Sequence, residues 1–190
     1  MFRTWFLTAN DSYVLQIQND RLLLNWRRRH GEYPRFESVF TEFGQHVERF
    51  TQLAGRLGLG PIELRTVEVS YINWIADLDP SEFLVAAHLP STTAPEVIDP
   101  PAQQQWLAQY AVALASGTSA NLALQCASAI RPLPPPPQTG YQFVLTFRAP
   151  QVSFQDLVSV ISTGRNVIVQ TFTDLTTPDA HATWGRKVKP

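Results

Sequence analysis

The stretch from Tyr13 to Arg29 constrains the fold of this chain more than any other segment. Asn19-Asp20 lies near its middle, and both residue types accept the positive φ that tight hairpin turns require. Before this turn apolar and polar side chains alternate, and after it the same two faces continue with Leu23 as an apolar exception, as in a strand with one buried face. The apolar face of the predicted β-hairpin holds Leu15, Ile17, Leu22, Leu24 and Trp26, and the opposite face holds Gln16, Gln18, Leu23, Asn25 and Arg27.

A further strand is predicted before the hairpin, at Arg3–Thr8, with Ala9-Asn10-Asp11 as the connecting turn. The three strands would form an antiparallel meander with Arg3–Thr8 at one edge. An edge strand offers unpaired backbone groups to other chains. We therefore expect this edge to be covered by an upstream strand or by another chain.

A long amphipathic helix is predicted next, from about Arg35 to Leu57. It follows Tyr33-Pro34 and ends at Gly58 and Gly60, which are typical of helix ends. Its apolar side chains recur at spacings of three and four, so we expect them to pack as core on the apolar face of the hairpin. This stripe comprises Phe36, Phe40, Phe43, Val47, Phe50, Ala54 and Leu57.

The rest of the chain is predicted to add three strands and two helices. The strands lie within Ile62–Ile75 and at about Ala120–Ile130 and Tyr141–Arg148. The helices lie at Gln103–Ala115, with Trp106, Tyr110 and Leu114 on one side, and at Leu157–Leu175, capped by Ser153 and followed by a short turn from Pro178.

This order, βββ-α-β-α-ββ-α, predicts an α+β fold. Neighbouring strands joined by short turns favour one largely antiparallel six-stranded sheet, with helices packed mainly on one face. Residues 1–190 suit a single domain with an N-terminal half at about 1–80 and a C-terminal half at about 100–190. Proline-rich connectors are expected near 91–101 and 132–138.

The composition disfavours several classes of protein. The net charge of −1 argues against general affinity for nucleic acid or membranes, which needs clustered positive charge. No apolar run approaches the ~20 residues that span a bilayer, and no N-terminal targeting signal occurs. The single cysteine, Cys126, has no disulfide partner within the chain and lies in an apolar run, so we expect it to be buried in a cytoplasmic protein.

No arrangement typical of an enzyme or a metal site occurs in the sequence. The histidines are scattered at His30, His46, His88 and His181, whereas zinc needs three or four converging ligands. The sequence also contains neither a nucleophile elbow nor a phosphate-binding loop. We therefore expect no metal and no cofactor, and we keep an enzyme with His181 as base, oriented by Asp174, as an alternative.

Four sequence blocks together resemble a sporadically distributed bacterial family of uncharacterised proteins over nearly the whole chain. The blocks are Gln-x-Gln-x-Asp-Arg-x₃-Asn-Trp-Arg at 16–27, Tyr-Pro-Arg at 33–35, Glu-Val-Ser-Tyr-x-Asn at 68–73, and Phe-Thr-Asp-Leu-Thr-Thr-Pro-x₂-His-x₂-Trp-Gly-Arg at 172–186. Members of that family typically carry an extra N-terminal strand and helix, which this sequence does not show. The resemblance therefore implies that another chain or a homodimer covers an exposed edge, and it implies no activity.

The resemblance also selects polar residues as candidates for a binding site. They are Gln16, Gln18, Arg21, Asn25, Arg27, Tyr71, Asn73, Asp174, His181, Trp184 and Arg186. The structural alternative is that these groups pair with one another or with loop backbone.

We predict from the sequence that this chain is a non-catalytic protein that binds a protein partner or a second copy of itself. The Gln/Asn/Arg face of the hairpin and the C-terminal tail would form the contact surface. Two alternatives stay open besides: the enzyme with His181 and Asp174, and single-stranded nucleic-acid binding through Arg27–Arg29 beside Trp26 and Tyr33.

Overall fold

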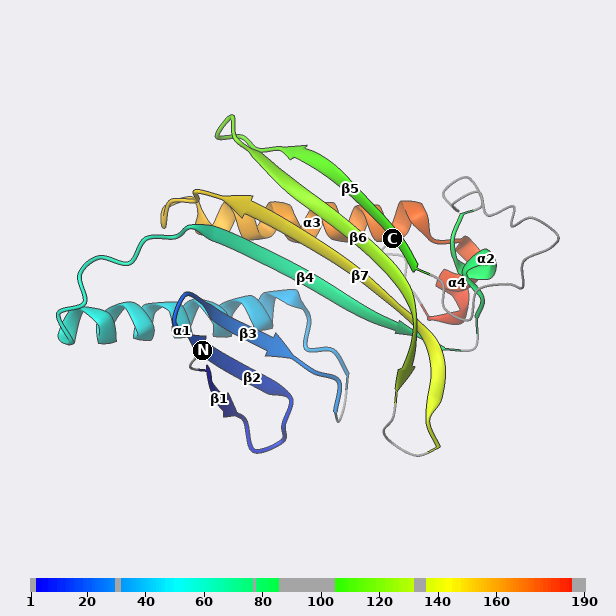
Figure 1. Cartoon of the computed structure of the whole chain (residues 1–190), viewed down its shortest axis with the longest axis horizontal. Coiled ribbons are helices and arrows are strands. Elements are labelled where there is room, and N and C mark those ends of the chain that lie inside the picture. Colours follow the sequence, from blue (N-terminus) through cyan, green and yellow to red (C-terminus); the bar gives the residue numbers. More distant parts are fainter. Residues whose placement is uncertain (1–2, 30–31, 77, 86–104, 132–135, 186–190) are drawn as a thin grey trace. The chain divides into compact units, whose positions relative to one another are not determined.

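The computed structural model describes residues 3–29, 32–76, 78–85, 105–131 and 136–185. They belong to two compact units, Met1–Glu63 and Leu64–Pro190. The α+β class and the antiparallel pairing are confirmed, but the single six-stranded sheet is wrong. The strands form two separate sheets, in the orders β1-β2-β3 and β4-β7-β6-β5 (Figure 1). The long helix α1 follows β3 in the chain, and β4 after it pairs with β7, which is distant in sequence.

The first sheet contains β1 (Arg3–Leu7), β2 (Tyr13–Gln18) and β3 (Leu22–Trp26). Its register confirms the predicted hairpin, since Ile17 pairs with Leu22 and Leu15 with Leu24 across the turn. The expected reason for the turn is wrong, however. Neither Asn19 nor Asp20 has a positive φ; in this sheet that conformation occurs at Asp11, with φ of 54°, in the β1–β2 turn.

Helix α1 (Phe36–Arg56) confirms the predicted helix, but its apolar stripe is buried less deeply than expected. Only Ala54 of that helix is buried, although Phe36 and Phe40 stack with their centroids 5.6 Å apart. Length explains the difference. A helix of 21 residues extends about 32 Å, whereas a five-residue strand extends about 17 Å and cannot cover it. Gly58, with φ of 66°, follows the helix, and the Leu59 amide donates to the Ala54 carbonyl.

The second sheet contains β4 (Thr66–Ile75), β5 (Gln105–Ala113), β6 (Ser119–Arg131) and β7 (Gln138–Pro150). The predicted helix at Gln103–Ala115 is wrong, because this segment is β5 and pairs with β6 along its whole length. The four-residue spacing of Trp106 and Tyr110 fits a helix, but it also places both on one face of a strand. The hydrogen bonds to β6 decide between the two conformations.

Helix α3 (Leu157–Leu175) confirms the last predicted helix and packs on β4 and β7, as the orange helix along the second sheet in Figure 1 shows. The predicted cap by Ser153 is wrong in position: the helix begins at Leu157 and is preceded by Asp156, whose side chain makes no cap bond, while the Ser153 hydroxyl accepts from the Asp156 amide at 3.1 Å in the turn before the helix. The core of this unit lies on the sheet face that bears Leu122, Leu124, Phe143, Leu145 and Phe147, each 0–2 % exposed.

Two short helices complete the second unit: α2 (Pro80–Phe83), capped by Asp79, and α4 (Pro178–Thr183), capped by Thr177. Backbone bonds join the segments next to them, from the Val85 amide to the Leu175 carbonyl and from the Thr177 amide to the Phe83 carbonyl. Within the described ranges no helix is both long and apolar enough to cross a membrane. The loop expected at 91–101 and most of the connector at 132–138 lie outside the described residues.

Candidate functional site

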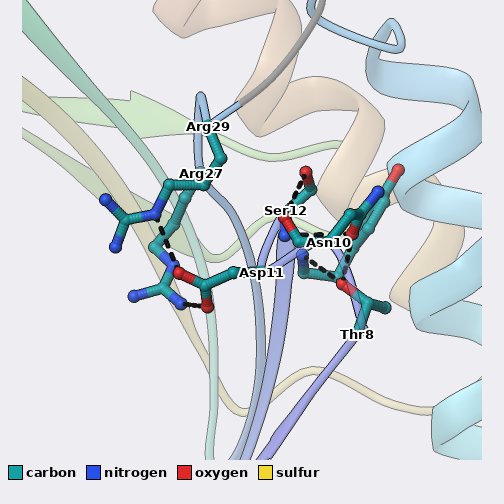
Figure 2. A network of polar contacts seen from close by, with 7 residues as sticks. Thr8, Asn10, Asp11, Ser12, Arg27 and Arg29 are labelled. Atoms are coloured by element: carbon teal, nitrogen blue, oxygen red, sulfur yellow. Dashed lines mark hydrogen bonds and ion pairs between the residues drawn. The ribbon is translucent and has the colours of Figure 1, made fainter.

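A polar network in the first unit engages two of the three arginines of the basic run (Figure 2). The Asp11 carboxylate accepts from the guanidinium of Arg27 through one oxygen and lies 2.9 Å from Nε of Arg29 through the other. The side chains are 32 %, 44 % and 40 % exposed for Arg27, Arg29 and Asp11. One carboxylate thus offsets part of the positive charge that the sequence places here.

The β1–β2 turn fixes the position of Asp11. The Asn10 carboxamide oxygen accepts from the Thr8 hydroxyl at 2.8 Å and from the Ser12 amide at 3.2 Å, and the Thr8 hydroxyl accepts from the Tyr13 amide at 3.0 Å. Ser12 is buried, and its carbonyl accepts from the Arg27 amide. Arg27 is therefore held through both its backbone and its side chain, which indicates a structural role.

The other predicted residues of the hairpin are distributed differently. Gln16 and Gln18 are half-buried in β2, Asn25 is exposed in β3, and Arg21 is exposed in the turn. Arg21 donates from Nε and Nη2 to the neighbouring Asp20 carboxylate, and its hydrogen bond lowers the pKa of that carboxyl. Gln16 lies opposite Trp5 of β1, and Gln18 lies opposite Arg3. The amide-bearing face therefore continues onto the edge strand.

The edge strand β1 carries the residues that the sequence analysis did not select. Trp5, Phe6 and Leu7 are 50 %, 54 % and 53 % exposed. They are consecutive, so apolar side chains leave both faces of the strand instead of alternating with polar ones. That lack of alternation is visible in the sequence and could have marked β1 as part of the site, because a strand with a single buried face would carry polar side chains on its exposed face.

The predicted residues of the second unit lie on the helix-covered side of its sheet or at its C-terminal end. Tyr71 is half-buried opposite Leu145, and the Asn73 carboxamide donates to the Phe143 carbonyl at 3.2 Å. The Asn73 bond ties β4 to β7 and gives this residue a structural partner.

Each of the two proposed acid–base residues has a polar partner a few positions away in the sequence. Asp174 accepts from the Gln170 carboxamide at 2.8 Å, while Nε2 of His181 lies 2.6 Å from the Thr176 hydroxyl. The Trp184 ring packs against Phe172 and Phe83, with centroids 5.6 and 6.4 Å away. Arg186 lies outside the described residues. Among the side chains that the structure describes, no group of three or more His, Cys, Asp or Glu could hold a metal ion.

Cys126 is buried as expected, at 4 % exposure, and burial raises the pKa of its thiol to about 11. At pH 8 only about one molecule in a thousand would carry the thiolate, which is the reactive form. We expect iodoacetamide to leave the folded chain almost unmodified while it labels the urea-unfolded chain within minutes. Mass spectrometry of intact protein measures this, and equal labelling rates in both states would contradict the buried position.

The two groups of candidate residues thus belong to different units. In the first group Gln16 and Gln18 lie opposite residues of the edge strand β1, and the described members of the second group are engaged mainly in packing and hydrogen bonds. In comparisons with protein-family models, curated proteins and solved structures, nothing matches this chain.

Proposed function

We propose that this chain is a non-catalytic interaction protein that binds a protein partner through its first unit. The contact surface, called the β1 surface below, consists of Arg3, Trp5, Phe6 and Leu7 of β1 with Gln16 and Gln18 of β2. Trp and Arg are the residue types that most often dominate binding energy at protein interfaces. Amides beside them can satisfy the polar rim of such a contact.

The observation that carries this proposal is the imbalance between core and surface in the first unit. Its buried hydrophobic residues, among those described, are Val14 and Ala54. Its exposed large hydrophobic residues include Trp5, Phe6 and Leu7 on one strand and Leu53, Leu57 and Leu59 at the end of α1. Clustered exposed apolar side chains are typical of interaction sites, whereas single ones need no explanation.

Two contacts favour this proposal over the alternatives. Nucleic-acid binding through Arg27–Arg29 would need free guanidinium groups, but Arg27 and Arg29 are both engaged by Asp11. At the other candidate site, Nε2 of His181 lies beside the Thr176 hydroxyl and Asp174 accepts from the Gln170 carboxamide, so each side chain has a partner that supports a structural role. The ring contacts of Trp184 favour a packing role for the C-terminal tail.

Affinity capture with the full chain as bait tests the proposal. Wild-type protein, a Trp5→Ala variant and an Ile72→Ala variant are immobilised and exposed to a lysate of the host to which an untagged copy of the chain is added. Bound proteins are then quantified by mass spectrometry. Ile72 is 66 % exposed in the second unit and serves as the matched control. We expect at least one protein, or the untagged copy, to be depleted about tenfold or more by Trp5→Ala and retained by Ile72→Ala, since an interface aromatic commonly contributes 2 kcal/mol or more. If Trp5→Ala changes nothing in the captured set, the β1 surface is not a binding site.

A further inference from the structure

We infer that the partner of the β1 surface is a second copy of this chain, whose β1 pairs antiparallel with the first around Trp5. This inference rests on the proposed function and specifies its partner. Two three-stranded sheets would join into one continuous six-stranded sheet with strand order β3-β2-β1-β1-β2-β3.

The direction of the backbone groups of β1 supports this pairing. The Thr8 amide donates to the Tyr13 carbonyl, and the register pairs Phe6 with Leu15 and Thr4 with Ile17. In an antiparallel ladder the residues that bond to one neighbour alternate with those that face away from it. The amides and carbonyls of Arg3, Trp5 and Leu7 therefore point away from β2, to an edge that has no neighbouring strand in the described part of the chain.

Those three residues form a self-complementary set. When Trp5 lies opposite the Trp5 of a second copy, Arg3 lies opposite Leu7 and Leu7 opposite Arg3. Every outward amide and carbonyl of the three then finds a partner of the opposite type. The two strands are identical and antiparallel, so a single two-fold axis through Trp5 relates the copies and the contact is closed.

Charge and side-chain placement favour a second copy as well. Arg3 is the only charged residue of β1, and this register keeps the two Arg3 side chains at opposite ends of the pair. The two Trp5 rings meet on the face that also bears Gln16, while Phe6 of each copy meets Thr4 of the other on the opposite face. The strand also has no Lys, no Pro and no bulge, which are three of the features that commonly keep an edge from pairing.

Sedimentation velocity over a concentration series tests whether the contact exists. We expect the wild-type chain to dimerise, and Trp5→Lys to weaken dimerisation about tenfold or more because two ammonium groups would face each other across the axis. Ile72→Lys introduces the same charge at a more exposed strand position in the second unit and should dimerise like the wild type. Circular dichroism confirms that each variant is folded. A wild-type chain that stays monomeric, or a dimer that Trp5→Lys leaves intact, overturns the inference.

Disulfide trapping tests the register. In the proposed pairing Thr4 lies opposite Phe6 of the second copy in a non-hydrogen-bonded pair, where Cα atoms are about 4.5 Å apart, within the range that a disulfide spans. A Thr4→Cys chain and a Phe6→Cys chain, both with Cys126→Ala, are mixed and oxidised gently. We expect the mixed disulfide to form in preference to either symmetric one. Preferred 4–4 and 6–6 disulfides would indicate a parallel pairing and overturn the inference.

The two proposals fail in different ways. A monomeric chain that nevertheless captures another protein through Trp5 removes the second copy as partner and keeps the proposed function. A chain for which neither self-association nor capture depends on Trp5 removes both.

Discussion

Replacing Phe143 by Ala is expected to lower the free energy of unfolding of the second unit by about 3–5 kcal/mol, the range for deleting a buried aromatic side chain. Phe143 has 0 % exposure and lies on the face of β7 that α3 covers. The centroid of its ring lies 6.3 Å from that of Trp106 in β5 and 5.7 Å from that of Phe172 in α3, so this side chain joins the sheet to the helix. Neighbouring rings are rigid and cannot collapse fully into the space that Ala leaves.

Urea unfolding followed by circular dichroism measures this effect, with Ile72→Ala as the control. Ile72 lies on the opposite face of the same sheet and is 66 % exposed, so its truncation should change the unfolding free energy by about 0.5 kcal/mol or less. Similar effects of the two substitutions would mean that the sheet is not covered on the Phe143 face.

The sequence pattern predicts the strands and helices whose periodicity is unambiguous. The hairpin, α1 and β4 each show one period over enough residues to exclude the other, and each is found within a few residues of its expected bounds. The pattern of α3 is mixed, because Gly164 interrupts it and Val167-Ile168-Val169 favours a strand, yet the segment is a helix as predicted. Segment β5 fails this condition, because Trp106, Tyr110 and Leu114 are consistent with both periods. Its conformation depends on hydrogen bonds to β6, a non-local contact that periodicity does not report.

The division into two sheets could not be predicted for a related reason. Strand order depends on which edges meet after α1, and neither the turn residues nor the side-chain alternation of β4 specifies whether it pairs with β3 or β7. The structure pairs β4 with β7 over the full length of β4, from Thr66 to Ile75. The β7 residues that lie opposite one face of β4 are Tyr141, Phe143, Leu145, Phe147 and Ala149. Pairing with β7 therefore gives β4 a longer apolar face than pairing with the five-residue strand β3 would.

The polar network at Asp11 was within reach of the sequence. A hairpin that turns at Asn19-Asp20 places Ser12 opposite Arg27, and in the structure the Arg27 amide donates to the Ser12 carbonyl. Asp11, next to Ser12, is then close to both Arg27 and Arg29. These arginines were kept as candidates for nucleic-acid binding because Trp26 and Tyr33 lie beside them in the sequence. The edge strand was predicted, but its consecutive apolar residues were not selected as site residues, because the selection followed polar side chains.

Gly164→Ala is expected to destabilise the second unit by about 1–3 kcal/mol, although Ala is the better helix former. A Cβ added to Gly164 would lie 2.5 Å from Cδ1 of Phe147, closer than carbon atoms can approach. Phe147 has 0 % exposure and sits in a sheet that is paired on both sides, so its ring cannot yield easily. Helix α3 must therefore move away from β7 and lose contacts.

The same change in α1 should have the opposite sign. Gly44 lies inside that helix, and a Cβ there would meet nothing within 4 Å, so Gly44→Ala should stabilise the chain by about 0.5–1 kcal/mol through reduced entropy of the unfolded state. Urea unfolding of both variants measures the pair. Because helix propensity favours Ala at both positions, only the close approach of α3 to β7 can make the two effects differ in sign. A stabilising Gly164→Ala would therefore show that α3 lies farther from the sheet than Phe147 requires.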